Sequence, residues 1–393
     1  MVTHAHAIGN TAVARSLGRA GYRVHALTDL ADAVVLRSRF VTVPVVTPPY
    51  GSPGFADWIL DYVGRHDIRV IIPSEGFLVA TRSVFEQLRP LMPLPEDWEV
   101  VEESFSKTRY FDTFLRHEDA RLRQNIPASL VVWRDQSMPT EAHVAQLGSP
   151  LYVKADEVLD DAGRSGGVFR CQTPQQALEA VGRLLRTHRG VLVQGPVPGV
   201  KATYNVCLNR GRLLAESMAL ALHEAPHSGG LTVLRRTWWH DGIREDALRR
   251  LEAMRWDGVA MMEYKWDEAS RQFGFIEANT RFWAALHLDL FAGADFPRIQ
   301  VEAFLGQAQG EVVRPSREVT CRYTVPGDTS WLLSSLRDPA VPATRKLSRL
   351  LRFAAMFLDP RVESDLLFPG DRKLYWLEWQ RFLRDLGKPA SGH

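Results

Sequence analysis

A run of alternating polar residues inside an apolar segment, FGFIEANTRFW at 273–283, limits how this chain can fold more than any other stretch of it. Glu277, Asn279 and Arg281 take every second position of this run. Successive side chains of a β-strand point to opposite faces, so these three share one face. Burying a carboxylate, an amide and a guanidinium without partners is unfavourable. This face is therefore either exposed to water, or it holds a ligand that needs oxygen atoms and a positive charge.

A second strand-like segment, VAMMEYKWD at 259–267, precedes this run. The two segments predict a β-hairpin in which Glu263 lies directly opposite Glu277, and in which Phe275 shares the face of Glu277. Like charges at opposed positions destabilise a hairpin, and a bound divalent cation would reverse that effect. Carboxylate and amide oxygens are ligands that Mg²⁺ accepts, so Glu263, Glu277 and Asn279 are candidate metal ligands. The alternative is a solvated strand face with a structural Arg–Glu pair.

Residues 1–104 alternate helical and strand-like patterns. A helix ends at Gly21 and the apolar strand YRVHAL follows, and a second helix precedes a strand at 70–72. This alternation predicts a parallel sheet with helices on its faces, here a Rossmann-like domain. Its first strand is short, since only Met1–Thr3 precede the first loop. The domain has Gly9 but lacks the Gly-x-Gly-x-x-Gly pattern, which argues against a nicotinamide oxidoreductase.

The pattern changes after about Ser104. Residues 105–310 contain two hairpin patterns and a glycine-containing loop between strands at 151–155 and 168–171, which predicts an antiparallel α+β domain. Residues 311–393 are predicted to be mostly helical. The expected fold class is therefore α/β plus α+β.

Composition narrows the functional classes. The formal net charge of +2 gives no general attraction to nucleic acid or to anionic membranes. Cys171, Cys207 and Cys321 lie far apart, so a disulfide framework or a zinc site is not expected, and a reducing compartment fits best. No apolar run approaches the length of about 18 residues that a membrane span needs. The first residues do not resemble a signal peptide, so we expect a soluble cytoplasmic protein.

Two lysines lie where an anion is expected. Lys154 precedes the loop DDAGRSGG, where glycines let backbone N–H groups approach phosphate oxygens and a lysine supplies a point charge. Lys107 lies in the first turn of a helix, where the helix dipole disfavours a positive charge unless an anion is near. An ordinary glycine turn and a surface lysine are the alternatives, so neither residue identifies a phosphate site by itself.

The segment 259–297 resembles the metal-binding end of the ATP-grasp superfamily, in its carbamoyl-phosphate-synthetase-like branch of carboxylate–amine ligases. In that branch a strand with a glutamate is followed by a Glu-x-Asn-x-Arg strand and an Ala-Gly-x-Asp-Phe-Pro turn, present here as AGADFP. The resemblance follows the order of elements over most of 3–310. It implies an ATP-grasp fold in which two α+β subdomains clasp ATP. The lid subdomain would lie at about 128–195, after the Rossmann-like domain, and a helical tail would end the chain.

The resemblance also implies cofactors and catalytic residues. The cofactors would be ATP and Mg²⁺, with Mn²⁺ able to replace Mg²⁺. Glu263 and Glu277 would ligate the metal, with Glu277 bridging two ions and Asn279 completing the second. Arg281 would contact the transferring phosphoryl group or the substrate oxyanion, and Lys154 would neutralise phosphate charge.

Further residues are implied to bind the nucleotide or the substrate. The expected nucleotide ligands are Lys107, Lys154, Ser165, Gly166, Gly167, Gln194 and the backbone at Val197. The expected substrate-facing residues are Glu75, Ser228, Gly229, Gly230, Arg235 and Arg236. Either of the two arginines could hold a carboxylate with two parallel hydrogen bonds.

Together these features predict an ATP-dependent carboxylate–amine ligase. It would form an amide or peptide bond through an acyl-phosphate and release ADP and phosphate. The expected partners are small-molecule acids and amines, such as an amino acid or a peptide, without nucleic acid or a transmembrane segment, and a homodimer is possible. Two alternatives stay open. One is an ATP-grasp enzyme with a non-amine acceptor, giving a thioester or a phosphoryl product, and the other is a non-catalytic nucleotide-binding protein.

The segment KLSRLLRFAAMFLDP at 346–360 predicts an amphipathic helix with a leucine stripe and flanking basic residues. Such a helix either packs its stripe on the ATP-grasp domain or lies on a membrane surface. We expect it to pack, because the basic residues are few. We also expect it to form a helical pair with the segment LYWLEWQRFLRDLG at 374–387.

Overall fold

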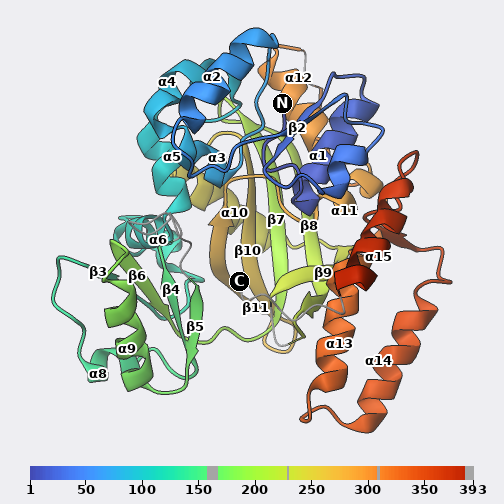
Figure 1. Ribbon diagram of the computed structural model, residues 1–393. Helices are drawn as coiled ribbons and strands as arrows, with labels where there is room; N and C mark the ends of the chain where they lie inside the picture. The colour runs from blue at the N-terminus through green and yellow to red at the C-terminus, as the bar shows by residue number, and fades with distance from the viewer. Residues whose placement is uncertain (157–166, 228–229, 308–309, 386–393) are drawn as a thin grey trace.

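The computed structural model describes residues 1–156, 167–227, 230–307 and 310–385. It contains a small parallel sheet, a four-stranded sheet and a seven-stranded sheet, so the mixed fold class predicted from the sequence is confirmed. In Figure 1 the N-terminal domain lies above the seven-stranded sheet, and the four-stranded sheet lies at the lower left.

The N-terminal domain is built on parallel pairing between short strands. β1 (His25–Thr28) pairs with β2 (Val43–Val46), and Val2 forms parallel bridges to Ala26 and to Ile72. The first strand is therefore reduced to one residue, Val2, which forms both bridges, in agreement with the few residues before the first loop. The helices of this domain are α1 (Ile8–Arg19), α2 (Phe55–Arg65), α3 (Glu75–Ala80), α4 (Phe85–Leu88) and α5 (Trp98–Phe105).

A four-stranded sheet occupies the stretch that was expected to form the lid. Its strand order is β3-β6-β4-β5, and all neighbouring strands are antiparallel. Ala177 and Val181 of helix α9 (Pro174–Leu184) pack with Val153 and Val193 of the sheet, and these residues belong to a separate apolar core. The elements are β3 (Ser129–Trp133), α8 (Glu141–Ala145), β4 (Leu151–Ala155), β5 (Val168–Cys171), α9 (Pro174–Leu184) and β6 (Gly190–Gln194).

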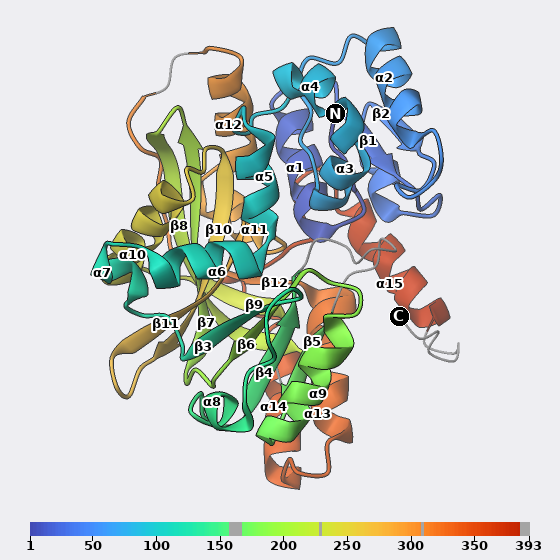
Figure 2. The same ribbon diagram turned by 90° about the vertical axis from the view of Figure 1, so that its left-hand side faces the viewer.

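The seven-stranded sheet forms the centre of the molecule (Figures 1 and 2). Its order is β11-β10-β7-β8-β9-β12-β13, and neighbouring strands are antiparallel except for the pair β12–β13. The two predicted hairpins are β7–β8 and β10–β11. The last two strands come from the region predicted to be mostly helical, which thus extends the sheet. The strands are β7 (Val200–Asn209), β8 (Arg212–Ala225), β9 (Leu231–Thr237), β10 (Val259–Asp267), β11 (Gln272–Asn279), β12 (Thr320–Arg322) and β13 (Val362–Ser364).

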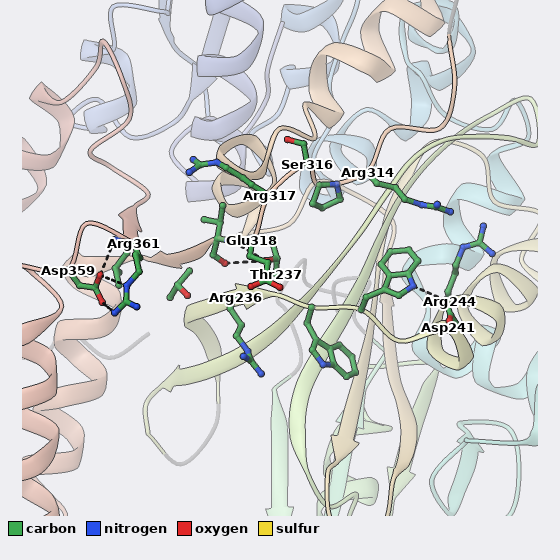
Figure 3. A pocket seen from close by; sticks show the side chains of 16 residues that line it. Arg236, Thr237, Asp241, Arg244, Arg314, Ser316, Arg317, Glu318, Asp359 and Arg361 are labelled. Carbon is green, nitrogen blue, oxygen red and sulfur yellow. Dashed lines mark hydrogen bonds and ion pairs between the residues drawn. The ribbon is translucent and has the colours of Figure 1, made fainter.

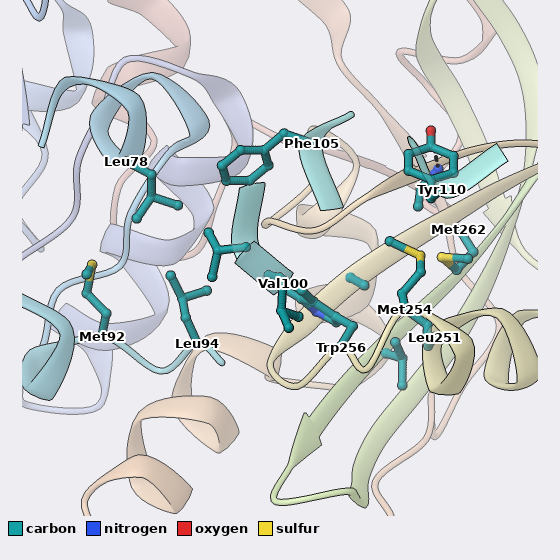
Figure 4. Packing of buried hydrophobic residues seen from close by; sticks show 14 of the residues in the cluster. Leu78, Met92, Leu94, Val100, Phe105, Tyr110, Leu251, Met254, Trp256 and Met262 are labelled. Atoms are coloured by element: carbon teal, nitrogen blue, oxygen red, sulfur yellow. Dashed lines mark hydrogen bonds between the residues drawn. The ribbon is translucent and has the colours of Figure 1, made fainter. Parts of the chain in front are cut away.

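One continuous apolar core joins the N-terminal domain to the seven-stranded sheet. Leu78 of α3 and Phe105 of α5 belong to the same cluster as Leu251 and Met262 (Figure 4). Apolar packing therefore sets the position of the N-terminal domain on the sheet. The helices near the sheet are α6 (Lys107–Arg116), α7 (Ala120–Arg123), α10 (Asp241–Ala253), α11 (Leu286–Ala292) and α12 (Phe296–Phe304).

The C-terminal helices depart from the expected pairing. α13 (Thr329–Arg337) and α14 (Ala343–Ala355) form a helical hairpin at the lower right of Figure 1, and no residue of α14 is buried. α15 (Lys373–Asp385) lies against the N-terminal domain, where Leu374 packs with Ile8. The predictions that α14 packs its stripe on the ATP-grasp domain and pairs with α15 are therefore wrong. None of the described helices combines the length and the apolar character that crossing a bilayer requires.

Candidate active site

The register of the hairpin β10–β11 places Glu263 opposite Glu277, as predicted from the sequence. A β-bulge follows, because the register shifts after Glu263 and Tyr264 pairs with Phe275. The extra residue in β11 turns Phe275 away from the face of Glu277. Phe275 is completely buried in the apolar core, so the prediction that it shares the face of Glu277 is wrong.

Glu277 is kept ionised by lysines from other parts of the chain. Lys107 is the first residue of α6, and its Nζ lies 2.5 Å from Oε2 of Glu277. Burial alone would raise the pKa of Glu277, but the charges of Lys107 and Lys154 outweigh burial and lower this pKa to about 2. Glu277 is thus the nearby anion that a lysine in a first helical turn requires.

Glu263 lies in a different environment. Burial and the negative charge of Glu277 raise the pKa of Glu263, against the opposing effect of Lys201. Nζ of Lys201 is 3.1 Å from Oε1 of Glu263 and 3.4 Å from Oε1 of Glu224. Burial alone would lower the pKa of Lys201, but these carboxylates raise it. The two opposed glutamates are therefore accommodated by a cation beside each, Lys107 beside Glu277 and Lys201 beside Glu263.

Lys154 reaches the site from the four-stranded sheet. Its Nζ donates to Oε1 of Gln194 at 2.6 Å, and Nε2 of Gln194 donates to Oγ of Ser129 at 3.2 Å. Lys154 and Gln194 are both buried, on the neighbouring strands β4 and β6. The positive charge of Lys154 also lowers the pKa of Glu277 in the hairpin.

Arg281 follows β11 and contacts the N-terminal domain. Its Nε lies 3.0 Å from Oε1 of Glu75, the first residue of α3. Its Nη2 donates to Oδ1 of Asn279 at 3.3 Å, and Nδ2 of Asn279 donates to Oε1 of Glu277 at 3.3 Å. One chain of contacts therefore connects residues that were predicted separately as substrate, catalytic and metal-binding residues.

A cavity of about 310 Å³ opens beside these residues. Gly230 lines it with a φ of +154°, and a Cβ at this position would come within 2.3 Å of the carbonyl oxygen of Ala225, so glycine is required. Several small residues also line the cavity. The charged lining residues are Lys201, Arg235, Glu263, Glu277 and Arg281, and the alanines are Ala219, Ala221, Ala284 and Ala285.

The two arginines predicted to hold a substrate carboxylate lie in different places. Arg235 lines the cavity but is completely buried, and its Nη1 and Nη2 bond the two carboxylate oxygens of Asp365 at 3.0 and 2.7 Å. This internal pair takes the place of the expected substrate contact. Arg236 lies in a separate open groove of about 1110 Å³, which is also lined by residues 314–320 and by Asp359 and Arg361 (Figure 3). Neither position agrees with an arginine that is free to bind a carboxylate beside Glu277.

The remaining predicted ligands lie in loops. Gly167 is exposed just before β5, and Val197 lies after β6, where its side chain approaches Gly274 of β11. Four of the predicted ligands lie outside the described residues, namely Ser165, Gly166, Ser228 and Gly229.

The sequence-based prediction did not include Lys201 or Glu224 among the site residues. Lys201 and Thr203 alternate in β7 and pair with Lys265 and Glu263 of β10. The same period of two that identified the face of Glu277 would have placed Lys201 on it, once β7 was known to pair with β10. Nothing in the sequence near Glu224 indicates that pairing.

The donor set of the site fits Mg²⁺. Magnesium is commonly bound by one or two carboxylates, with phosphate oxygens and water completing its coordination. Glu263, Glu277 and Asn279 supply two carboxylates and an amide oxygen on one face. Within the described ranges, no group of three or more His, Cys, Asp and Glu side chains could hold a metal. Two carboxylates and one amide oxygen leave the rest of the coordination sphere of Mg²⁺ to phosphate oxygens and water.

No protein-family model matches this chain, and the search of curated proteins finds no similar sequence. Solved structures do match. The biotin carboxylase domain of 2-oxoglutarate carboxylase from Hydrogenobacter thermophilus has a TM-score of 0.60 at 15% identity, over 81% of this chain and 73% of that chain. N5-carboxyaminoimidazole synthetase from Staphylococcus aureus has a TM-score of 0.59 at 14% identity, over 81% and 80%. L-amino acid ligase from Bacillus licheniformis has a TM-score of 0.57 at 16% identity, over 81% and 78%. These neighbours are ATP-grasp enzymes, and this chain has the ATP-grasp fold.

Proposed function

We propose that this protein is an ATP-dependent carboxylate–amine ligase, which joins a small acid to an amine and releases ADP and phosphate. The observation that carries the proposal is the pair of opposed glutamates, Glu263 and Glu277, beside Lys107 and Lys154 at the edge of a cavity. Two carboxylates at directly opposed positions, Glu263 buried and Glu277 half-buried, destabilise a fold unless a positive charge neutralises them. They are suited to hold a cation together with a triphosphate.

The nucleotide would bind between the four-stranded sheet and the hairpin. Lys107 and Lys154 would contact its phosphates, and Gln194 with the backbone after β6 would contact the adenine. The opposed glutamates and Asn279 would hold Mg²⁺, which supplies neutralisation of the phosphate charge when bound. The Hydrogenobacter domain binds MgADP and the Staphylococcus synthetase binds ADP, which supports ATP and Mg²⁺ as cofactors. Mn²⁺ has no such support.

The acid would occupy the cavity of about 310 Å³. This volume is at the small end for ligand sites, which favours an acid the size of an amino acid or a short peptide. The alanines in its lining leave room for a side chain on the acid. Arg235 and its partner Asp365 are both buried, whereas the side chain of Arg281 is 38% exposed, so we assign the contact with the carboxylate or the transferring phosphoryl group to Arg281.

The reaction needs no nucleophilic side chain. A carboxylate oxygen of the acid attacks the γ-phosphorus of ATP, ADP leaves, and an acyl-phosphate forms. The amine nitrogen then attacks the acyl carbon, phosphate leaves, and the amine loses a proton to water. Lys107, Lys154 and Arg281 would neutralise the charge that spreads over the transferring group. The likeness of the fold to L-amino acid ligase favours an amine as acceptor.

The proposal is tested by measuring ADP release over a panel of amino acids and short peptides, offered as acid and amine together. We expect at least one pair to give ADP and an amide product. Glu277→Gln should lower turnover about a thousandfold, because it removes a ligand charge that acts in the transition state. Glu268→Gln is the matched control, since Glu268 lies in the turn of the same hairpin with a side chain that is 79% exposed.

Other results would lead to a different function. ADP release that needs no amine, with a product trapped by hydroxylamine, would indicate a non-amine acceptor. ATP binding without ADP release over the whole panel would indicate a non-catalytic nucleotide-binding protein. Near wild-type turnover by a folded Glu277→Gln variant would contradict the metal assignment.

A further inference from the structure

Helix α14 presents an apolar stripe to solvent. Leu347, Leu350, Leu351 and Leu358 are 58%, 44%, 61% and 87% exposed. These residues recur at helical spacing, so they lie along one side of the helix and its C-terminal extension. Scattered single apolar residues are normal on protein surfaces, but a contiguous stripe marks an interaction site.

The opposite side of α14 is the side that packs. The guanidinium of Arg349 lies 5.5 Å from the ring centroid of Trp331 in α13, and that of Arg322 in β12 lies 4.1 Å from the ring of Phe353. These contacts orient the helix and direct the leucine stripe outward. Figures 1 and 2 place the α13–α14 hairpin at the end of the molecule away from the N-terminal domain, so that domain does not cover the stripe.

The charge around the stripe identifies its partner. Between 343 and 358 the chain carries Arg345, Lys346 and Arg352, besides the Arg349 that packs on α13, and no acidic residue. Pairing this helix with the same helix of a second copy would bring two such sets of positive charges together, without acidic side chains on either helix to neutralise them. A surface of anionic lipid headgroups is complementary both to the leucines and to the basic residues.

From these observations we infer that α14 docks the protein on the surface of a bilayer that contains anionic phospholipids. The leucine stripe enters the boundary between headgroups and acyl chains, and the flanking basic residues contact the headgroup phosphates. This inference does not depend on the proposed ligase activity. The helix lies on the surface and does not cross the bilayer.

The test is flotation of the full chain with vesicles of phosphatidylcholine alone and of phosphatidylcholine mixed with phosphatidylglycerol. We expect binding only to the mixed vesicles, and weaker binding as salt is raised. The variant with Leu351→Glu and Leu358→Glu should lose vesicle affinity by about tenfold or more, because two inserted side chains become charged. Its melting temperature should stay unchanged, since both leucines are exposed. Val46→Glu, at a position that is 53% exposed in β2, is the matched control and should bind normally.

A second variant separates the charge from the stripe. Arg345→Gln with Arg352→Gln should lower affinity for the mixed vesicles and flatten its salt dependence, while leaving the leucines in place. Equal vesicle binding by the wild type and the double-glutamate variant would overturn the inference. So would a wild type that ignores both kinds of vesicle but forms a dimer, measured by light scattering, that the double-glutamate variant dissociates.

Discussion

Each charged side chain at the candidate site is paired with a residue from a distant part of the sequence. Lys107 meets Glu277, Lys201 meets Glu263, and Nε of Arg281 lies 3.0 Å from Glu75. Lys107 and Glu263 are buried, so removing the partner of either one would leave a buried charge without compensation, which destabilises a protein. Arg281 and Glu75 are 38% and 33% exposed, so their pair contributes much less to stability. The pairs therefore keep the site folded without its ligands, and a nucleotide with its metal would have to rearrange them on binding.

Lys154 provides a test of the nucleotide site at this scale. Lys154→Met should weaken ATP binding about tenfold or more, because it removes a charge-assisted contact to phosphate and the partner of Gln194. Binding is measured by calorimetry in the presence of Mg²⁺. Lys373→Met, which changes an exposed lysine of α15, serves as the control. An ATP affinity that is equal in all three proteins would assign Lys154 a structural role only.

At the scale of single elements, the bulge in β11 decides what the hairpin can do. A regular strand would send Phe275 and Glu277 to the same face. The extra residue lets Glu277 face the cavity while Phe275 stacks in the core, where the guanidinium of Arg250 lies 4.6 Å from the centre of its ring. One strand thus contributes both to the site and to the core.

The bulge predicts that two nearby phenylalanines contribute differently to the stability of the fold. Phe275→Ala should lower the free energy of unfolding by about 3–5 kcal/mol, because it leaves a cavity at a completely buried position. Phe273→Ala, at a half-buried position before the bulge, should cost clearly less. Urea unfolding measures both. Should Phe275→Ala keep its stability and change only ligand binding, the face assigned to Phe275 would be incorrect.

At the scale of the whole molecule, the C-terminal region binds the other parts together through buried charges. Nε of Arg15 in α1 donates to Oδ2 of Asp371 at 2.9 Å, and its Nη1 donates to the carbonyl oxygen of Asp365 at 2.8 Å. Asp365 also forms the two bonds with Arg235 at the cavity. The N-terminal domain, the C-terminal region and the cavity wall therefore depend on one network.

This network predicts a large effect from a change far from the cavity. Asp371→Asn should lower the free energy of unfolding by about 3–5 kcal/mol, because the buried Arg15 loses the carboxylate with which it forms an ion pair. The double variant Arg15→Met with Asp371→Leu should lose less than the sum of the two single changes. The control is Asp32→Asn, which removes a 59% exposed partner of α15 and should cost under about 1 kcal/mol. Additive effects at positions 15 and 371 would contradict the network.

His287 makes the stability of this network depend on pH. Burial lowers its pKa to about 3, with Arg15, Arg235 and Asp365 as the charged groups around it. Between this value and the unfolded value of about 6.5, the unfolded chain binds more protons than the folded one, so stability falls as the pH falls through this window. From pH 6.5 to 5 this amounts to about 2 kcal/mol.

The pH dependence of the unfolding free energy is measured by urea unfolding at several pH values. His287→Gln cannot take up the proton, so its unfolding free energy should fall less steeply than that of the wild type below pH 6.5. His143→Gln, at an exposed position in α8, should keep the wild-type slope. Parallel curves for the wild type and His287→Gln would show that other groups cause the loss of stability.

What the sequence determined by itself about this protein is local. The period of two in the strand sequences predicted the shared face of Glu277, Asn279 and Arg281. Placing the glutamates of both strands on one face of the hairpin predicted Glu263 opposite Glu277. These inferences needed only neighbouring residues, since strand geometry relates residues that are close in the chain. The ATP-grasp fold followed from the resemblance of this same stretch.

Only the tertiary structure decided which distant residues meet. The pair of Arg235 with Asp365 joins positions 130 residues apart, and no local pattern relates them. The pairing of β7 with β10, which brings Lys201 to Glu263, is equally remote in sequence. The exposed side of α14 was missed for the same reason, because an amphipathic pattern predicts an apolar face but does not identify the surface that covers it. Such contacts depend on how whole elements pack, and packing is determined by the entire chain.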